Sequence, residues 1–470
     1  MNDNSGEKLA AQRMTAELWR ALDGAPEMPG GLEMAGEGSL PSVFAVSDFA
    51  ASAIATAGLA LAEWSVLHGD AAPAIRVDRR LASLWFGFSV APQGWPLPPV
   101  WDAIAGDYRS SDGWIRLHTN APHHRAAALS VLGVAAERDV VAAAVAGWNA
   151  DALEAAIVSA GGCAATMHRS DAWRLHPQGR AVMAEPLMHH KLTSMGAVPR
   201  HRFEPKRPLA GVKVLDLTRV LAGPVATRFL AGFGAEVLRV DPPGWDEGAI
   251  VPDVTLGKRC ARLDLKSHAG CERFKQLLAD ADVLVHGYRA DALEALGLGE
   301  DVRREIRPGL IDVAHNAYGW TGAWRNRRGF DSLVQMSSGI AEAGMIARTA
   351  GHPVPLPVQA LDHGTGYLLA AATLRGLTLR AKEGRGSVWR TSLVRVAEFL
   401  KVWPHRADET GIGEVDFGEP EPDDFCDSME PTDWGPALRL RAPVTVGAAS
   451  MSWATPATRL GSSSAAWAGS

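Results

Sequence analysis

The chain has 470 residues, a length that predicts two to four compact domains and excludes a single small binding module. Hydrophobic residues make up 47% of the sequence and charged residues 21%, an ordinary globular composition that excludes wholesale disorder. Lys and Arg number 47 against 53 Asp and Glu, so the net charge is −6 and the balance does not favour nucleic acid as a partner.

Four cysteines are spread along the chain without a CxxC pair, which predicts neither a disulfide framework nor a zinc ribbon. The first residues mix acids, amides and bases, which is not how a secretory signal begins. The uncharged, Ala-rich stretch at residues 49–62 is shorter than the roughly 20 residues that span a bilayer. We therefore expect a soluble cytoplasmic protein with no membrane partner.

Shifts in composition divide the chain. Residues 24–39 are rich in Gly, Pro and Glu, the segment HRFEPKRPLAG is basic with two prolines, and an acidic, proline-punctuated stretch follows Trp403. The predicted organisation is a flexible lead-in (1–39), a first module (40–200), a linker (201–210), a Rossmann-like module (211–403) and an irregular tail (404–470).

Within the second module, apolar runs of strand length alternate with helical patterns, as is typical of βαβ units on a parallel sheet. The first module differs, with a long Ala-rich helix from Asp48 to about Val66, a strand in GWIRLHT, a helix in DALEAAIVSA and no opening βαβ series. The predicted fold class is α/β, a Rossmann-like parallel sheet domain plus a smaller α+β domain, with ligands outside the carboxyl ends of the strands. The predicted strands are 212–217, 236–240, 261–265, 282–285 and 310–315, with helices at 225–232 and 272–281.

Several cofactor motifs are missing. GLGEDV lacks the third glycine of a dinucleotide fingerprint, so NAD and FAD are not expected, and LGKR is not a phosphate-binding Walker loop. HExxH and GxSxG are also absent from the sequence. We expect no metal site.

The stretch PVQALDHGTGY carries the most chemistry. Asp362 precedes a helix predicted from about Gly364 to Arg380, and it could simply cap that helix. A cap does not explain Gly364 and Gly366, each of which costs about 1 kcal/mol relative to alanine in a helix. We interpret the glycines as clearance for a bulky ligand group beside a carboxylate that the helix dipole keeps ionised and nucleophilic.

From Leu209 to about Leu400 the sequence resembles the family III CoA-transferases (the CaiB/BaiF and formyl-CoA transferase group). The resemblance rests on LAGVKVLDLTRVLAGPVATRFLAGFGAEVLRVDPP, KRCARLDLKS, DVLVHGYRADALEALGLG and RRGFDSLVQMSSG, in that order before LDHGTGY. It implies that acyl-CoA and a carboxylic acid are the substrates. It also implies that Asp362 is a nucleophile that forms a mixed anhydride and then an aspartyl-CoA thioester.

The resemblance further implies a set of residues that bind CoA. The turn that lies along CoA is matched by Val220, Leu221 and Ala222, and the adenine and phosphate end of the CoA site by Leu263 and Lys266. The loop beside pantetheine is matched by Tyr288 and Arg289. The positions that flank the active site are matched by Arg328 and Asp331. With Gly364 and Gly366 they complete the predicted site.

Some positions depart from the family pattern. Pro242 and Pro243 stand where relatives carry a basic residue, and His286 to Arg289 replace the usual Asn-Phe-Arg segment. An acyl-CoA racemase of the same family would need a histidine where this chain has Phe330. Racemase or isomerase activity, or a CoA-binding pseudoenzyme, remain alternatives to transfer.

Residues 40–64 echo the segment around Asp362 and place Asp48 opposite it. Residues 40–200 look like the back half of one transferase and 208–400 like the front half of another. We interpret the chain as a fused, rearranged copy with Asp48 as a relic or cap, and consider a homodimer possible.

Overall fold

The computed structural model describes residues 4–199, 201, 203–404 and 418–468. Its largest sheet has seven strands in the order β10-β9-β8-β11-β12-β13-β7. All neighbouring strands are parallel except β13 and β7, which are antiparallel. The Rossmann-like sheet is therefore confirmed, and its order reverses between β8 and β11. The strands are β7 (His189–Met195), β8 (Lys213–Leu217), β9 (Glu236–Asp241), β10 (Lys258–Arg262), β11 (Val283–His286), β12 (Ile311–Asn316) and β13 (Arg385–Ser392).

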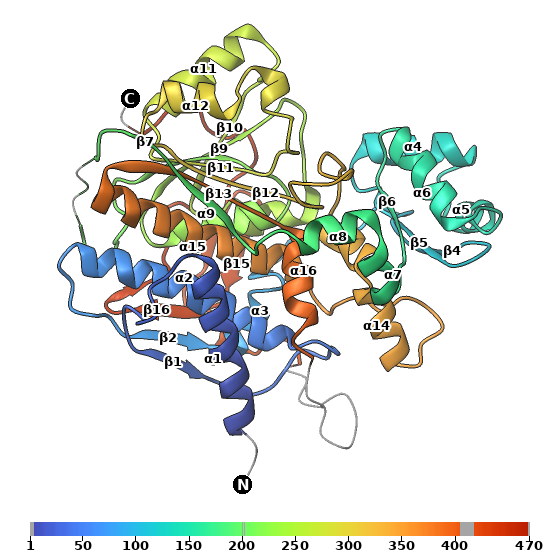
Figure 1. Ribbon diagram of the computed structural model, residues 1–470, viewed down its shortest axis with the longest axis horizontal. Coiled ribbons are helices and arrows are strands. Elements are labelled where there is room, and N and C mark those ends of the chain that lie inside the picture. The colour runs from blue at the N-terminus through green and yellow to red at the C-terminus, as the bar shows by residue number, and fades with distance from the viewer. Residues whose placement is uncertain (1–3, 200, 202, 405–417, 469–470) are drawn as a thin grey trace.

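Helices cover both faces of this sheet (Figure 1). On one face lie α11 (His268–Ala279) and α12 (Glu300–Ile306), while α9 (Ala222–Gly232) and the long α15 (Ala360–Glu383) lie on the other. Nearly all of α15 is buried, because it is packed between the sheet and further helices rather than exposed on one side. The connection from β12 to α15 contains α13 (Asp331–Ser337) and α14 (Ile340–Ala347), and α16 (Leu393–Lys401) follows β13.

A second, four-stranded sheet, β1-β2-β16-β17, lies beyond α15 (Figure 1). Its strands β1 (Leu32–Ala35) and β2 (Ile75–Asp78) are parallel and are joined through α2 (Val46–Leu67), which packs directly on α15. The predicted absence of an opening βαβ series concerned residues 40–200; the structure has one βαβ unit here, and its first strand lies in the predicted lead-in. Leu32 and Met34 alternate with exposed residues in a strand of only four, a signal too short to stand out among glycines and prolines.

The smaller α+β domain is confirmed at the side of the molecule (Figure 1). Its antiparallel sheet, β4-β5-β6, is covered by three helices around a core of its own. From it the chain returns through α7 (Ser170–Leu175) and α8 (Pro177–Met183) to β7 at the edge of the large sheet. The elements are β4 (Gly106–Arg109), β5 (Trp114–Leu117), β6 (Ala164–Thr166), α4 (Pro122–Leu132), α5 (Arg138–Val145) and α6 (Ala150–Ser159).

The predicted flexible lead-in, residues 1–39, is instead ordered from Asn4. Helix α1 (Asn4–Ala21) packs on α2 and buries Met14, Leu18 and Leu22, which recur every four residues on one face. Arg375 of α15 donates hydrogen bonds to the carbonyls of Leu22 and Asp23, which fixes the end of this helix.

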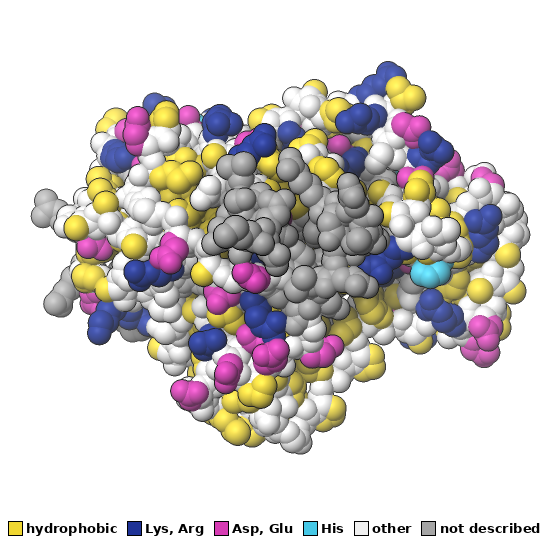
Figure 2. Space-filling model, turned by 90° about the horizontal axis from the view of Figure 1, so that it is seen from below, with side chains coloured by type: hydrophobic (Ala, Val, Ile, Leu, Met, Phe, Trp, Pro, Cys, Tyr) yellow, Lys and Arg dark blue, Asp and Glu magenta, His cyan; other side chains and the backbone are white. Residues whose placement is uncertain are grey.

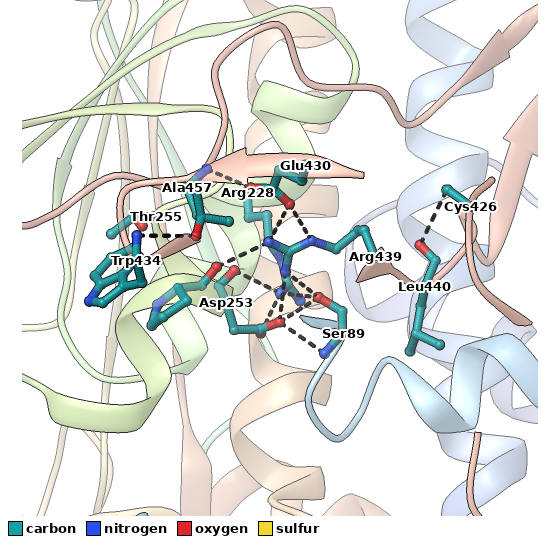
Figure 3. Close-up of polar contacts among 12 residues, drawn as sticks. Ser89, Arg228, Asp253, Thr255, Cys426, Glu430, Trp434, Arg439, Leu440 and Ala457 are labelled. Atoms are coloured by element: carbon teal, nitrogen blue, oxygen red, sulfur yellow. Dashed lines mark hydrogen bonds and ion pairs between the residues drawn. The ribbon is translucent and has the colours of Figure 1, made fainter. Parts of the chain in front are cut away.

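The predicted irregular tail, residues 404–470, is also different, although 405–417 lie outside the described residues. Strands β14 (Glu430–Thr432) and β15 (Gly435–Arg439) pair with β3 (Val90–Pro92), and β16 (Val444–Val446) pairs with β2 and β17 (Ala449–Ser450). Buried Arg439 of β15 bonds Ser89, Glu430 and Asp253, which come from three segments far apart in the sequence (Figure 3). Both β15 and β16 pair with strands more than 300 residues earlier, β3 and β2, and such pairings leave no local signal in the sequence.

In the part of the chain that the structure describes, one helix, α2, is long and apolar enough to cross a membrane. Of its most apolar window, 83% is buried inside the fold, as in the core helix of a globular domain. On the face seen in Figure 2, side chains of both charges are interspersed among apolar ones around the residues drawn in grey.

Candidate active site

A cavity of about 500 Å³ opens where the strand order of the large sheet reverses. It is lined by residues just after β8 (Arg219 and Val220), after β11 (Gly287 to Arg289) and at the end of β12. These are the carboxyl ends of neighbouring parallel strands, the position in which such sheets bind ligands.

Asp362 lines this cavity and also a second one of about 530 Å³. It is the third residue of α15, which begins at Ala360 after Gln359, so the interpretation of Asp362 as the N-cap is wrong. Its exposure is only 8%, yet it reaches both cavities. The carboxylate therefore stands at the junction of two spaces, each large enough for part of a ligand.

Asp331 lies directly behind Asp362 and is fully buried. Its carboxylate accepts a hydrogen bond from the backbone N–H of Asp362 at 2.9 Å and another from Gln335, and so holds the first turn of α15. Burial raises the pKa of Asp331 to about 6. Burial and then the charge of Asp331 raise the pKa of Asp362 well above its ordinary value, which opposes the expected effect of the helix dipole.

Gly364 and Gly366 of α15 do not clear space for a ligand, and this correction changes their role. A side chain at Gly364 would collide with the ring of Phe49 in α2, and one at Gly366 would meet the carbonyl of Ala222 and the side chain of Val225 in α9. Neither glycine lines either cavity. They allow α2 and α9 to approach α15 closely, so their missing side chains serve helix packing.

The turn between β8 and α9 forms a wall shared by both cavities. Val220 lines both and has a φ of 65°, a left-handed conformation that is rare for a β-branched residue. Its N–H donates to Glu247 at 2.7 Å, and the same Glu247 oxygen accepts from the indole of Trp245 at 2.8 Å. Glu247 is paired with buried Arg239 at 2.8 Å, so the strained turn is held by a fixed carboxylate.

Buried Lys258 anchors the other end of this turn. Its ammonium contacts Asp216 at the end of β8 at 3.1 Å and donates to the carbonyl of Pro224 in α9 at 2.9 Å. Burial lowers the pKa of Lys258 to about 8. Sequence reasoning missed both Lys258 and Glu247, because their role depends on contacts across the sheet.

The first cavity is rich in cations. Arg219, Lys266, Arg289 and Arg328 all line it, together with Tyr288. Arg219 donates to the hydroxyl of Tyr288 at 2.9 Å and lies over the rings of Trp245 and Tyr288, at 4.9 and 5.2 Å. The predicted residues Lys266, Tyr288, Arg289 and Arg328 thus come together around one space that suits phosphate groups.

Other predicted residues lie elsewhere. Leu221 lines only the second cavity. Ala222 is buried at the start of α9 and Leu263 packs on the apolar core beside α11, so neither reaches a cavity. Asp331 also lines neither cavity and acts on the site through Asp362.

The second cavity lies between the smaller domain and the large sheet. Trp101 and His118 line it from the first module, and Trp245, Ile250 and Phe330 from the second. The ring of His118 is stacked on Phe330 with centroids 3.7 Å apart, and burial lowers the pKa of His118 to about 3, so the imidazole is neutral. The sequence contains no local signal for His118, because only the packing of the smaller domain against the second module places it in the same cavity as Asp362.

His363, which follows Asp362, stacks on Phe86 and lines neither cavity. Among the described residues no group of three or more His, Cys, Asp or Glu could hold a metal ion.

Comparisons with known proteins agree with this geometry. Residues 209–415 match the model of CoA-transferase family III. An acyl-CoA transferase of Fusarium pseudograminearum is 31% identical over 49% of this chain and 56% of its own. Human succinyl-CoA:glutarate CoA-transferase is 36% identical over 38% of this chain and 44% of its own.

Among solved structures, Rv3272 from Mycobacterium tuberculosis is 33% identical over 42% of this chain and 59% of its own, with a TM-score of 0.38. The chain spans about half the length of the curated relatives it matches. The match begins at Leu209, where the resemblance in the sequence also begins, and includes β8, α9 and α15. Residues 209–415 are therefore the part of this chain that matches CoA-transferase family III.

Proposed function

We propose that the protein is a CoA-transferase that moves CoA from an acyl-CoA thioester to a free carboxylic acid through Asp362. The observation that carries the proposal is the position of this one carboxylate, at the junction of a cationic cavity and a mainly apolar one. The family match and the relatives named as CoA- and acyl-CoA transferases support the same activity.

The proposed reaction proceeds by exchange at carbonyl carbon. An oxygen of ionised Asp362 attacks the thioester, the C–S bond breaks, and CoA thiolate leaves a mixed anhydride. The thiolate then attacks the aspartyl carbon, which releases the donor acid and leaves an aspartyl-CoA thioester. The acceptor carboxylate attacks that thioester, which breaks the C–S bond, releases CoA thiolate and forms a second mixed anhydride. The thiolate then attacks the acceptor carbonyl of this anhydride, so acceptor acyl-CoA forms and the Asp362 carboxylate is regenerated with no net proton change.

The cationic cavity is the proposed CoA site. Arg219, Lys266, Arg289 and Arg328 can pair with phosphate oxygens, and Tyr288 with Trp245 offers aromatic surface beside Arg219. Burial and then the charge of Arg328 lower the pKa of Arg289. The two guanidinium groups are therefore close enough to repel each other, and an anion bound between them would relieve this repulsion.

The smaller domain of the first module closes the site over Asp362. Because both halves of the chain line the second cavity, we propose that one chain forms a complete site and that Asp48 is a relic. Asp48 is the third residue of α2, as Asp362 is of α15, but it is buried and paired with Arg79. A cytoplasmic location, where acyl-CoA is available, and a homodimer remain part of the proposal.

Isotope exchange tests the activity with any acyl group that the protein accepts. Each acyl-CoA of a panel is incubated with its own acid in deuterated form, and label in the acyl-CoA is measured by mass spectrometry. The wild-type protein should catalyse exchange and Asp362→Asn should not. Asp48→Asn is the matched control, because it removes the corresponding carboxylate of α2 and should retain exchange.

Two results would contradict the proposal. Equal exchange by Asp362→Asn would show that Asp362 is not the nucleophile. Entry of solvent deuterium at the α-carbon of an acyl-CoA, without any acid acceptor and without acyl exchange, would indicate an isomerase instead.

A further inference from the structure

The second cavity, which we call the acyl pocket, differs sharply from the CoA cavity in charge. Among the described residues that line it there is no Lys or Arg, whereas the other is lined by Arg219, Lys266, Arg289, Arg327 and Arg328. Its walls carry Trp101, Trp245, Phe330, Ile250 and Leu221. An organic group that enters it therefore meets aromatic and aliphatic surface.

The charged groups of the acyl pocket are acids. Asp102 accepts hydrogen bonds from Thr119 at 2.7 Å and from the N–H of Ile104, and its other oxygen is paired with Arg125 at 3.3 Å. Asp246 is exposed and accepts from the backbone N–H of Glu247 and Gly248. Both carboxylates disfavour a second negative charge on a bound substrate.

Cations beside the pocket are already engaged with other groups: Arg125 is paired with Asp102 at 3.3 Å, and Arg219 lies over the ring of Trp245 at 4.9 Å and donates to the hydroxyl of Tyr288. Arg116 lies over the ring of Trp101 at 4.9 Å and is paired with Asp107 at 2.8 Å. Arg239 is fully buried and paired with Asp241 and Glu247. His118, which does line the pocket, is neutral at physiological pH because burial lowers its pKa. None of these side chains is placed to neutralise a distal carboxylate.

From these observations we infer that the acyl groups this protein transfers are apolar monocarboxylic acids and not dicarboxylic acids. The inference rests on the proposed function and specifies its substrate class. A distal carboxylate would lose its water in a pocket with no positive partner, and an unpaired buried charge is strongly disfavoured. An alkyl or aryl chain of the same length would instead gain from burial against Trp101 and Trp245.

Hexanoate and adipate form a matched pair, because both have six carbons and differ only in the distal carboxylate. Exchange of each labelled acid with its own acyl-CoA should give a kcat/KM for hexanoate at least about tenfold above that for adipate. Val100→Arg places a cation on the exposed rim of the acyl pocket and should raise the adipate to hexanoate ratio several-fold. Val100→Gln, which is polar but neutral, should leave that ratio unchanged.

Binding of hexanoyl-CoA and adipyl-CoA, measured by calorimetry, separates this inference from the proposed function. If neither acid exchanges but hexanoyl-CoA binds at least about tenfold more tightly, the transferase proposal fails and the inferred pocket specificity stands. If adipyl-CoA binds or exchanges as well as its partner, the inference is overturned whether or not transfer occurs.

Discussion

Burial raises the pKa of the proposed nucleophile Asp362 and the charge of Asp331 raises it further, so substitution of Asp331 gives a prediction at the scale of single residues. Asp331→Asn removes the negative charge behind Asp362 and leaves an amide oxygen that can still accept from the Asp362 N–H. Since that charge raises the pKa of Asp362, its loss should lower this pKa. The acidic limb of kcat/KM against pH should move to lower pH by roughly one unit.

The same substitution has a consequence for stability. The pKa of Asp331 is raised on folding to about 6, so its contribution to stability is complete below the unfolded value near 4 and is lost as pH rises through 6. Asp331→Asn should therefore raise the melting temperature at pH 8 relative to wild type. Asp48→Asn should leave the acidic limb in place, and an unshifted limb in Asp331→Asn would contradict the coupling.

Val220 combines a strained backbone with a position on both cavities. Val220→Gly removes a left-handed β-branched residue, a relief of about 1 kcal/mol that offsets the flexibility glycine adds. We expect a melting temperature equal to or above that of wild type and a clear fall in exchange, because the turn loses its side chain between the cavities. Strong destabilisation of this variant in thermal unfolding would refute the assignment of strain.

At the scale of elements, Gly364 reports on packing between α15 and α2. Gly364→Ala should destabilise the fold by about 1–3 kcal/mol, because the new methyl group meets the ring of Phe49. Phe49→Leu should recover part of that loss in the double variant. Denaturant unfolding of the single and double variants measures the coupling, and additive effects would contradict the contact.

Features of the fold and of the candidate site were predicted from the sequence where their signal is local, and were missed where it is not. The strands around Leu215 and Val285 were predicted because their local apolar runs alternate with helices, and the structure has them in one parallel sheet. Lys266, Tyr288, Arg289 and Arg328 were found through motif order and do share a cavity. The role of Gly364 was predicted wrongly because its neighbour, Phe49, lies more than 300 residues earlier and leaves no local trace.

The whole molecule shows an internal likeness that the sequence repeat only suggested. Helices α2 and α15 both begin after a residue with φ near −75° and ψ of 63°, and each places an aspartate third. Each helix joins two parallel strands, and in each sheet the second of these strands has an antiparallel neighbour, β16 beside β2 and β7 beside β13. The interpretation of the chain as a fused copy stays a prediction.

The C-terminal strands hold these halves together, so their anchor should matter to the entire fold. Arg439→Gln removes the cation that contacts Asp253 at 3.3 Å and Glu430 at 2.6 Å, and the cost should be about 3–5 kcal/mol because a buried carboxylate loses a partner. Limited proteolysis should then cleave residues 418–468 rapidly. Arg459→Gln, at an exposed position of the same segment, should behave like wild type, and equal resistance of both variants would disprove the anchoring role.

The most direct measurement of the central claim is to trap the covalent enzyme during turnover. The protein is incubated with an acyl-CoA, treated with hydroxylamine or borohydride, and digested for peptide mass spectrometry. Modification should occur at Asp362 alone, depend on the acyl-CoA, and disappear in Asp362→Asn. An unmodified Asp362 in a protein that still exchanges acyl groups, or a modification at another carboxylate, would contradict the mechanism.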